Sequence, residues 1–264
     1  MITNNPIAEL SGFIPPVAMQ LYVIAMAALV VAGTILDTIH KKSARYFFEN
    51  AKKTQANAER RLSSGEKASI ALKTAAVDVL ASGEFCNPKR RVAHLLTMYG
   101  FIIFVVTTVI LVFFYPTPDM SAPALLPLLW HLGALMVCIG GYWFWFAIRV
   151  DVAAEGNRWY RVYRADLFIL SLLATTTLAL IWSYLQWSEA GGWASLGFWL
   201  FIVASTVLFG GVMWSKFAHM FFKPAAAYQR RVAEADGSRD NLPSPADAPE
   251  KFGLGINREL PRHY

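Results

Sequence analysis

The sequence predicts an all-α integral membrane protein, a bundle of five transmembrane helices with the N-terminus outside and the C-terminus in the cytoplasm. The chain of 264 residues is 56% hydrophobic and only 16% charged, whereas a soluble domain of this length carries about a quarter charged residues. Five long stretches contain no Lys, Arg, Asp or Glu. When these stretches cross a bilayer in turn, all 24 Lys and Arg residues fall on one side.

Each uncharged stretch is long enough to cross about 30 Å of hydrocarbon as a helix. The stretches cover residues 17–36, 95–115, 124–148, 167–185 and 195–215. Solid apolar runs favour helices over a barrel, because barrel strands alternate between apolar and polar residues. The first stretch lacks a preceding basic region and is followed by Lys41 and Lys42, so we interpret it as an uncleaved span and not as a signal peptide.

The distribution of Lys and Arg predicts which side each connection lies on. The N-terminal arm (residues 1–16) and the connections around Pro116–Pro123 and Gln186–Ala194 carry neither residue. The positive-inside rule places these parts outside and the remaining connections in the cytoplasm. The chain is thus expected to consist of a periplasmic arm, a membrane domain over residues 17–223 and a cytoplasmic tail over residues 224–264.

The cytoplasmic connection over residues 38–93 is long enough to form structure of its own. Its pattern predicts amphipathic helices over Ala44–Leu62 and from Glu66 to about Leu80, separated by a break at Ser63-Ser64-Gly65. We expect a docking platform for a partner, and a solvated helical hairpin without a partner is the alternative.

The tail is expected to form a short helix from Lys223-Pro224 to about Ala235 and then an extended segment rich in turn residues. Its end, Lys251–Tyr264, regains apolar residues among charges. Disordered segments rarely need such side chains. This end is expected either to lie on a partner protein or to be disordered.

Composition also excludes some functions. The net charge of +6 is explained mostly by membrane orientation and gives no argument for nucleic-acid binding, although it could attract anionic lipid headgroups. The chain has two cysteines, Cys86 and Cys138, and no CxxC or CxxCH motif. It therefore offers no iron–sulfur cluster site and no covalent haem attachment site.

Two histidines near the inner face are the strongest candidates for a functional site. His94 begins the second span and His219 is expected to end the fifth, so both imidazoles would lie at a similar depth. Facing histidines on packed helices are a common way to hold haem iron in a helix bundle. The alternative is that both residues merely anchor helix ends at the interface.

The residues around these histidines are compatible with a haem. Gly100 and the pair Gly210-Gly211 lack side-chain bulk, which would let a porphyrin or another helix approach closely. Arg91 and Lys216, together with Arg90, lie where haem propionates would emerge.

Two further histidines are weaker candidates. His40 lies at the inner edge of the first span and could replace either ligand, although interfacial anchoring is the simpler role. His131 lies in the outer half of the third span without a partner histidine at that depth. It is expected to be a buried, hydrogen-bonded residue, and contact with a quinone is the more specific alternative.

The sequence resembles the nitrate-reductase-gamma-like cytochromes b, a family that includes the membrane subunits of heterodisulfide reductases. The resemblance lies in Arg91-xx-His94-xxxxx-Gly100-Phe101 with Thr107-Thr108, in the approach from Val77 to Cys86, and in Ser215-Lys216-Phe217-Ala218-His219-Met220 followed by Lys223. It covers about residues 15–225. Members of this family have five spans with the N-terminus outside and bind b haems through histidines of spans two and five.

The resemblance implies one b haem near the inner face, held by His94 and His219. Two-haem members have further histidines deeper in spans two and five, and this sequence has Phe104 and Phe201 in those regions. The outer haem is therefore expected to be absent. The resemblance also implies a bacterial inner-membrane location and electron exchange with a quinone.

Haem-poor relatives without clusters, in sulfur-oxidising bacteria, are associated with adenylylsulfate reductase, a cytoplasmic iron–sulfur flavoenzyme. The resemblance thus implies a membrane anchor and electron-transfer subunit that links such a flavoenzyme to the quinone pool and is itself non-catalytic. A haem-free anchor or scaffold for a soluble enzyme is the alternative. A small-solute transporter is a third possibility, which the lack of charges at mid-span disfavours.

Overall fold

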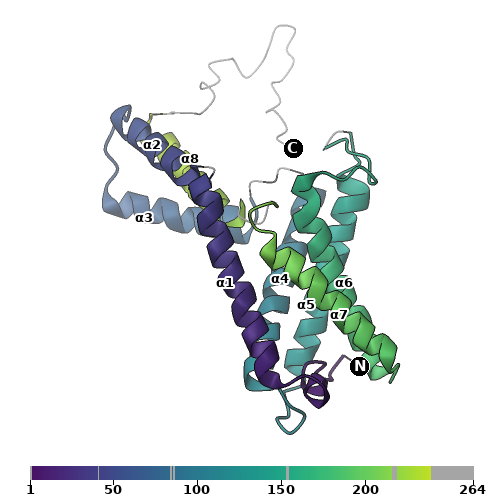
Figure 1. Ribbon diagram of the computed structural model, residues 1–264. Coiled ribbons are helices and arrows are strands. Elements are labelled where there is room, and N and C mark those ends of the chain that lie inside the picture. The colour runs from purple at the N-terminus through teal and green to yellow at the C-terminus, as the bar shows by residue number, and fades with distance from the viewer. Residues whose placement is uncertain are drawn as a thin grey trace. The chain divides into compact units, whose positions relative to one another are not determined.

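The computed structural model is all-helical and contains five helices that are long and apolar enough to cross a membrane (Figure 1). It describes residues 2–40, 42–83, 85, 87–152, 155–215 and 219–238, and the side chains of residues 43, 44, 219 and 221 lie outside this description. The predicted fold class, an all-α protein with five membrane spans, is confirmed.

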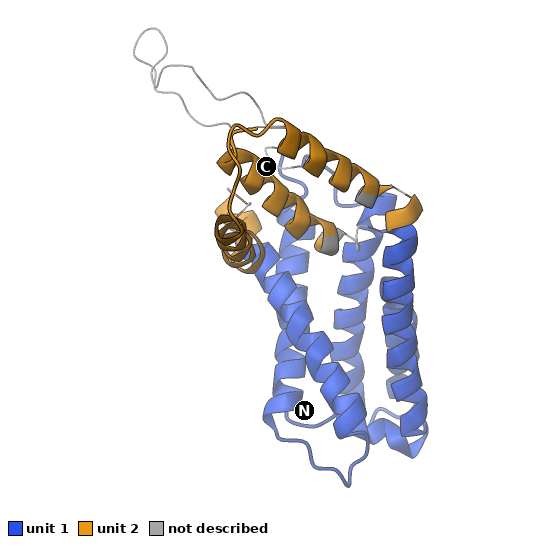
Figure 2. Cartoon of the chain, turned by 90° about the vertical axis from the view of Figure 1, so that its left-hand side faces the viewer, with its two compact units in different colours: residues 1–37, 92–218 blue, residues 38–91, 219–264 orange. Residues whose placement is uncertain are grey.

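The chain divides into two compact units (Figure 2). Unit 1 consists of residues 1–37 and 92–218, and unit 2 consists of residues 38–91 and the chain from residue 219 on. The long insertion between the first two spans therefore folds together with the segment that follows the fifth span.

Unit 1 contains the parts of the chain that cross the membrane. Its helices are α1 (Pro16–His40), α4 (Pro88–Phe114), α5 (Leu125–Trp143) with its continuation η3 (Phe144–Ile148), α6 (Leu167–Trp187) and α7 (Gly192–Gly210), of which α1 and α4 extend into unit 2 at one end. Each uncharged stretch of the sequence overlaps one of these helices. The agreement follows from length and hydrophobicity alone, since about 20 apolar residues form a helix in lipid.

The N-terminal arm is folded against the bundle. It forms a short helix, η1 (Ala8–Gly12), whose apolar side chains join the core of unit 1. The side-chain amide of Asn5 donates to the carbonyl of Tyr115 at 2.8 Å, and that of Gln186 donates to the carbonyl of Pro6 at 3.1 Å. These bonds tie the arm to the ends of α4 and α6.

Small residues allow α4 and α5 to pack with their backbones in contact. A Cβ atom added at Gly133 would lie 2.7 Å from the amide nitrogen of Phe104, and one added at Gly140 would lie 2.6 Å from the carbonyl oxygen of Ala93. Both distances are far below van der Waals contact. In lipid, where no hydrophobic force drives helices together, such close packing is a main source of association.

Unit 2 is built from α2 (Ser43–Ala56), α3 (Ser64–Lys73), η2 (Thr74–Leu80) and α8 (His219–Ala235). A break separates the two predicted helices, but it covers residues 57–63, and α3 begins at Ser64, two residues before the predicted start at Glu66. Ser63 caps α3 by accepting from the amide of Glu66, while the Glu66 carboxylate accepts from the amide of Ser63. The helix predicted to run to Leu62 ends earlier, at Ala56. The helix predicted from Lys223 begins earlier, at His219, and ends at Ala235 as expected.

The two chain segments of unit 2 are joined by charged and polar contacts. Arg231 of α8 forms two hydrogen bonds to the carboxylate of Asp78 in η2, at 2.6 and 2.9 Å. Arg60 donates to the carbonyl of Ala235 at 2.9 Å. The insertion and α8 therefore form a single folded body.

Candidate functional site

His94, the first predicted haem ligand, lies in the second turn of α4 and is half-buried. Phe101 follows seven residues later and lies on the same helix face. Its ring stacks against that of Phe209 in α7, with centroids 6.3 Å apart and an interplanar angle of 30°. Helices α4 and α7 are therefore neighbours in unit 1.

His219 was expected to end the fifth span, and this placement is wrong. The spanning helix α7 ends at Gly210, a turn follows over residues 211–215, and His219 begins α8 in unit 2. The physical reason is the pair Gly210-Gly211, because glycine has a low helix propensity and commonly terminates helices. Lys216 and the side chain of His219 lie outside the described residues, so the His94–His219 pairing stays a prediction.

Gly100, predicted to make room for a porphyrin or another helix, contacts α5. A Cβ atom at Gly100 would lie 2.7 Å from the carbonyl oxygen of Gly133 and 2.8 Å from the amide nitrogen of Val137. The space beside Gly100 is thus filled by the neighbouring helix.

Two of the other predicted residues are described. Arg91 lies in the first turn of α4, and its Nε donates to the carbonyl of Ala81 at 2.8 Å. This bond fixes the segment that leads into α4. His40 is the last residue of α1 and is exposed. This position agrees with the role of an anchor at a helix end.

His131 is buried in α5, with 5% of its surface exposed, and both of its ring nitrogens have partners. Nδ1 lies 2.7 Å from the carbonyl oxygen of Pro127, and Nε2 lies 2.8 Å from the hydroxyl of Ser183 in α6. Because a carbonyl only accepts, Nδ1 carries the hydrogen and Nε2 accepts from the serine. In this arrangement neither nitrogen is available to a metal, and the expected role of a hydrogen-bonded core residue is confirmed.

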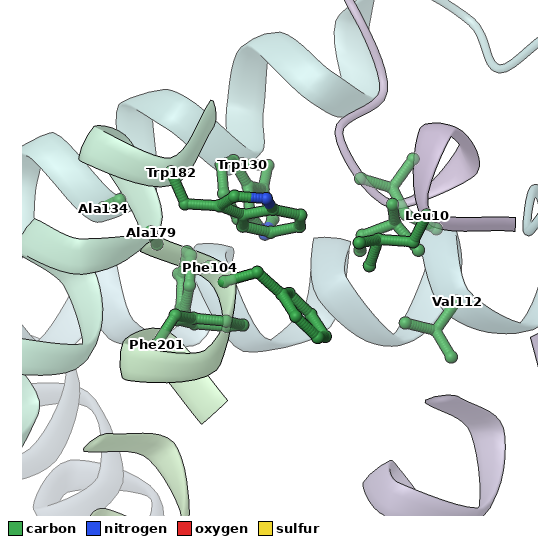
Figure 3. Close-up of a cluster of buried hydrophobic side chains, with 11 residues drawn as sticks. Leu10, Phe104, Val112, Trp130, Ala134, Ala179, Trp182 and Phe201 are labelled. Carbon is green, nitrogen blue, oxygen red and sulfur yellow. The ribbon is translucent and has the colours of Figure 1, made fainter. Parts of the chain in front are cut away.

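The two phenylalanines that stand where two-haem relatives have histidines belong to a packed aromatic cluster (Figure 3). Phe104 packs against Trp130 at a centroid distance of 5.2 Å, and Phe201 stacks on Trp182 at 5.6 Å with an interplanar angle of 16°. Trp130 and Trp182 meet edge to face at 6.3 Å. Four rings from α4, α5, α6 and α7 therefore occupy this level of the bundle.

One polar group of the cluster has a defined partner. The indole nitrogen of Trp130 donates to the hydroxyl of Thr108 at 2.9 Å. A buried indole N–H without a partner would cost about 1–3 kcal/mol, so this bond fixes the orientation of the ring. The cluster has the properties of a structural core.

The connection between α5 and α6 is organised around Arg149, which has only 1% of its surface exposed. Its guanidinium donates to the carbonyls of Arg158 at 3.0 Å and Arg161 at 2.9 Å, and it forms an ion pair with Asp166. The guanidinium also lies 4.2 Å from the centre of the Trp145 ring. One side chain thus holds the second half of the connection, from Arg158 to Asp166, in a defined conformation.

Asp166 has a second role at the start of α6. Its carboxylate accepts from the amide of Tyr163 at 2.8 Å, which forms a cap on the short helix η4 (Arg164–Asp166) that leads into α6. Sequence reasoning missed this site. The signal was present, because Arg149 is a single cation directly after a 25-residue uncharged run.

In unit 2, two cations lie close to the ring of Phe85. Arg90 is 5.6 Å and Lys223 is 5.3 Å from its centroid. These distances are within the range of cation–π attraction. The contacts bring the segment before α4 together with α8.

No known protein family, curated protein or solved structure matches this chain. The class that fold and sequence define is a multi-pass helical membrane protein.

Proposed function

We propose that this multi-pass membrane protein is the membrane-anchoring, electron-transferring subunit of a quinone-linked oxidoreductase complex. The observation that supports this proposal best is unit 2. Two segments of the chain, separated by four spans, fold into one helical body held by the Arg231–Asp78 pair. None of its helices α2, α3 and α8 is long and apolar enough to span a membrane. A folded body of this kind, attached to a membrane bundle, is suited to hold a soluble partner.

The proposed partner is a cytoplasmic iron–sulfur flavoenzyme similar to adenylylsulfate reductase, which the family resemblance implies. The charge of unit 2 supports an acidic docking surface on the partner. Residues 38–91 contain 12 Lys and Arg against 5 Asp and Glu. Opposite charges at such a surface accelerate association and align the two proteins. By the positive-inside rule, the same charges place unit 2 in the cytoplasm, and the resemblance implies a bacterial inner membrane.

The proposed cofactor is one b haem with His94 and His219 as axial ligands. A bound haem would supply one-electron transfer between the flavoenzyme and a quinone. Two histidines are chemically suitable ligands for this cofactor, because neutral imidazoles commonly bind the iron of b haems. In this proposal His94 and His219 would hold the haem, and Arg91 and Lys216 would bind its propionates.

A haem-free anchor is the second candidate, and a specific observation favours it. His219 begins α8 in unit 2, so it does not share a rigid spanning helix with Phe209, the residue that contacts the His94 face of α4. In this case His94 and His219 act only at helix ends, and the protein tethers its partner to the bilayer.

An absorption spectrum distinguishes the two candidates. Purified protein should show a b-type band in the reduced-minus-oxidised spectrum, and the band should be lost in His94→Ala and in His219→Ala. His131→Ala is the matched control, because both nitrogens of that ring are engaged elsewhere, and it should keep the band. A colourless but stably folded wild-type protein would establish the haem-free anchor.

Docking is tested separately by affinity purification from native membranes. The flavoenzyme should be retained by the wild-type protein and lost when Lys52 and Lys53, which are exposed on α2, are both changed to Glu. Retention of the flavoenzyme by this variant, or its absence from the wild-type complex, would contradict the proposed partner.

A further inference from the structure

The connection between α5 and α6 exposes an unusual run of side chains. All seven residues from Arg158 to Arg164 are exposed, and they comprise three arginines, three aromatic residues and a valine. Arg149 explains the orientation, because it binds the carbonyls of Arg158 and Arg161 from inside. With the backbone held inward at these two points, the side chains project outward from a fixed scaffold.

Exposed aromatic rings connect this run to the flank of the membrane helix. Tyr142 of α5 stacks on Phe146 of η3 at 6.1 Å, Phe146 packs against Trp159 at 6.2 Å, and Trp159 meets Tyr160 edge to face at 5.7 Å. Trp159 remains 57% exposed. The series therefore forms a continuous surface from the spanning helix to the connection.

These contacts place the connection at the level of the membrane surface. Phe146 lies two residues before Ile148, the last residue of a helix that is long and apolar enough to cross a membrane, so Trp159 is folded back against the last turn of that helix. Tyrosine and tryptophan favour this interfacial layer. A connection that rose into the cytoplasm would not touch the last turn of the span.

The arginines of the run are suited to bind phosphate at this level. The guanidinium of Arg158 lies over the Tyr160 ring at 5.9 Å and donates to its hydroxyl at 2.6 Å, which restrains it beside the exposed aromatic surface. Of the carboxylates that flank the run, Asp166 is already paired with Arg149, and Glu155 lies three residues before Arg158. Arginine binds phosphate oxygens through two parallel N–H groups, and anionic lipids attract cations near the surface.

We propose that residues 158–164 form a binding site for the headgroup of an anionic phospholipid, in the leaflet at which α5 ends. The arginines bind the phosphate, and the exposed rings of Trp159 and Tyr160 insert beside the acyl chains. The site depends only on unit 1 and on membrane insertion, so it is independent of the haem and of the proposed partner.

Lipid retention in nanodiscs tests the site. The nanodiscs contain equal amounts of phosphatidylglycerol and phosphatidylcholine, and native mass spectrometry gives the ratio of the two lipids that stay bound to the full chain. The test variant carries Arg158→Gln, Arg161→Gln and Arg164→Gln. Its preference for phosphatidylglycerol should fall about tenfold, since each phosphate loses charge-assisted hydrogen bonds.

Two matched variants control for the loss of charge. The first variant removes three exposed cations of unit 2 through Lys52→Gln, Lys53→Gln and Arg61→Gln. It should keep the preference for phosphatidylglycerol that is due to the α5–α6 connection. The other replaces the three arginines by lysine and should keep most of it. An unchanged preference in the glutamine variant of residues 158–164, or an equal loss in the unit 2 control, would overturn the proposal.

A label at Val162 gives an independent readout. Val162→Cys is made in a Cys86→Ser background, and the remaining Cys138 is buried. A fluorophore at this position should be quenched by nitroxide attached to lipid headgroups. Quenching by a dissolved aqueous quencher alone would show that the connection stands clear of the bilayer and would overturn the proposal.

Discussion

Replacing Arg149 with methionine should destabilise unit 1 more than any other single change of a charged residue in the α5–α6 connection. Methionine matches the length of the aliphatic stem but leaves Asp166 without its cation and removes the donors to the carbonyls of Arg158 and Arg161. Breaking a buried ion pair on one side costs about 3–5 kcal/mol, because the remaining charge is desolvated and unpaired.

The lower end of this range is the appropriate expectation. Asp166 keeps 15% of its side chain exposed, so water partly compensates its charge. The two carbonyls belong to exposed residues and can also turn toward water. We therefore expect a loss of about 3 kcal/mol in the free energy of unfolding, which corresponds to a decrease of about 6–12 °C in Tm for a unit of this size.

Thermal unfolding in a mild detergent measures this loss. Arg164→Met is the matched control, because Arg164 is an exposed arginine of the same connection and its replacement should change stability by less than about 0.5 kcal/mol. The double variant Arg149→Met/Asp166→Leu should regain part of the loss, since it removes the unpaired carboxylate. If Arg149→Met and Arg164→Met unfold at the same temperature, Arg149 does not organise the connection and the reasoning is refuted.

Two further predictions concern helix packing and pH. Gly133→Ala should destabilise unit 1 by about 1–3 kcal/mol, because the new Cβ atom would lie 2.7 Å from the amide nitrogen of Phe104. Gly192→Ala is the control. Its Cβ atom would meet no atom within 4 Å, so the unfolding temperature should stay nearly unchanged. The hydrogen bonds of Glu66 with Ser63 and Arg60 lower the pKa of Glu66 to about 2, so its stabilising effect is present above the unfolded pKa near 4.3 and is lost as the pH falls through 2. The difference in Tm between the wild type and Glu66→Gln should therefore be constant from pH 7 to about pH 5 and vanish near pH 2; a difference that persists at pH 2 would contradict this assignment.

Much of the fold could be predicted from the sequence, because in a membrane the length and hydrophobicity of a segment are sufficient to identify a helix. An apolar run of about 20 residues has no stable alternative to a helix in lipid, so each span was found from composition alone. The break at Ser63 was also readable, since a serine followed three residues later by glutamate is a helix-start signal. The helix end at Ala56 was not, because it depends on where the amides of Glu59 and Arg60 contact the carbonyl of Asp236. The end of α7 at Gly210 had a local signal in the pair Gly210-Gly211, which we interpreted only as room for a porphyrin or another helix.

The candidate sites were harder to predict, because they depend on contacts between distant residues. The role of Arg149 requires the carbonyls of Arg158 and Arg161 to turn inward, and no local pattern specifies this. The same is true of His131, whose partner Ser183 is 52 residues away. Gly100 is the clearest example of what the sequence cannot specify. A glycine in a span indicates that another group packs closely against the helix, but it does not show whether that group is a cofactor or a neighbouring helix.

The described polar side chains in the interior of the bundle are bonded to other parts of the protein, which directs the search for a functional site to other parts of the chain. His131, Trp130 and the Arg149 guanidinium are all bonded to other residues of unit 1. Among the described residues, the one buried side-chain nitrogen or oxygen without a hydrogen-bond partner is Oγ of Ser238, which lies outside the spans. Function is therefore best sought at the end of the bundle where α4 begins, and in unit 2, so the spectrum of the His94 and His219 variants decides between an electron conduit and an anchor alone.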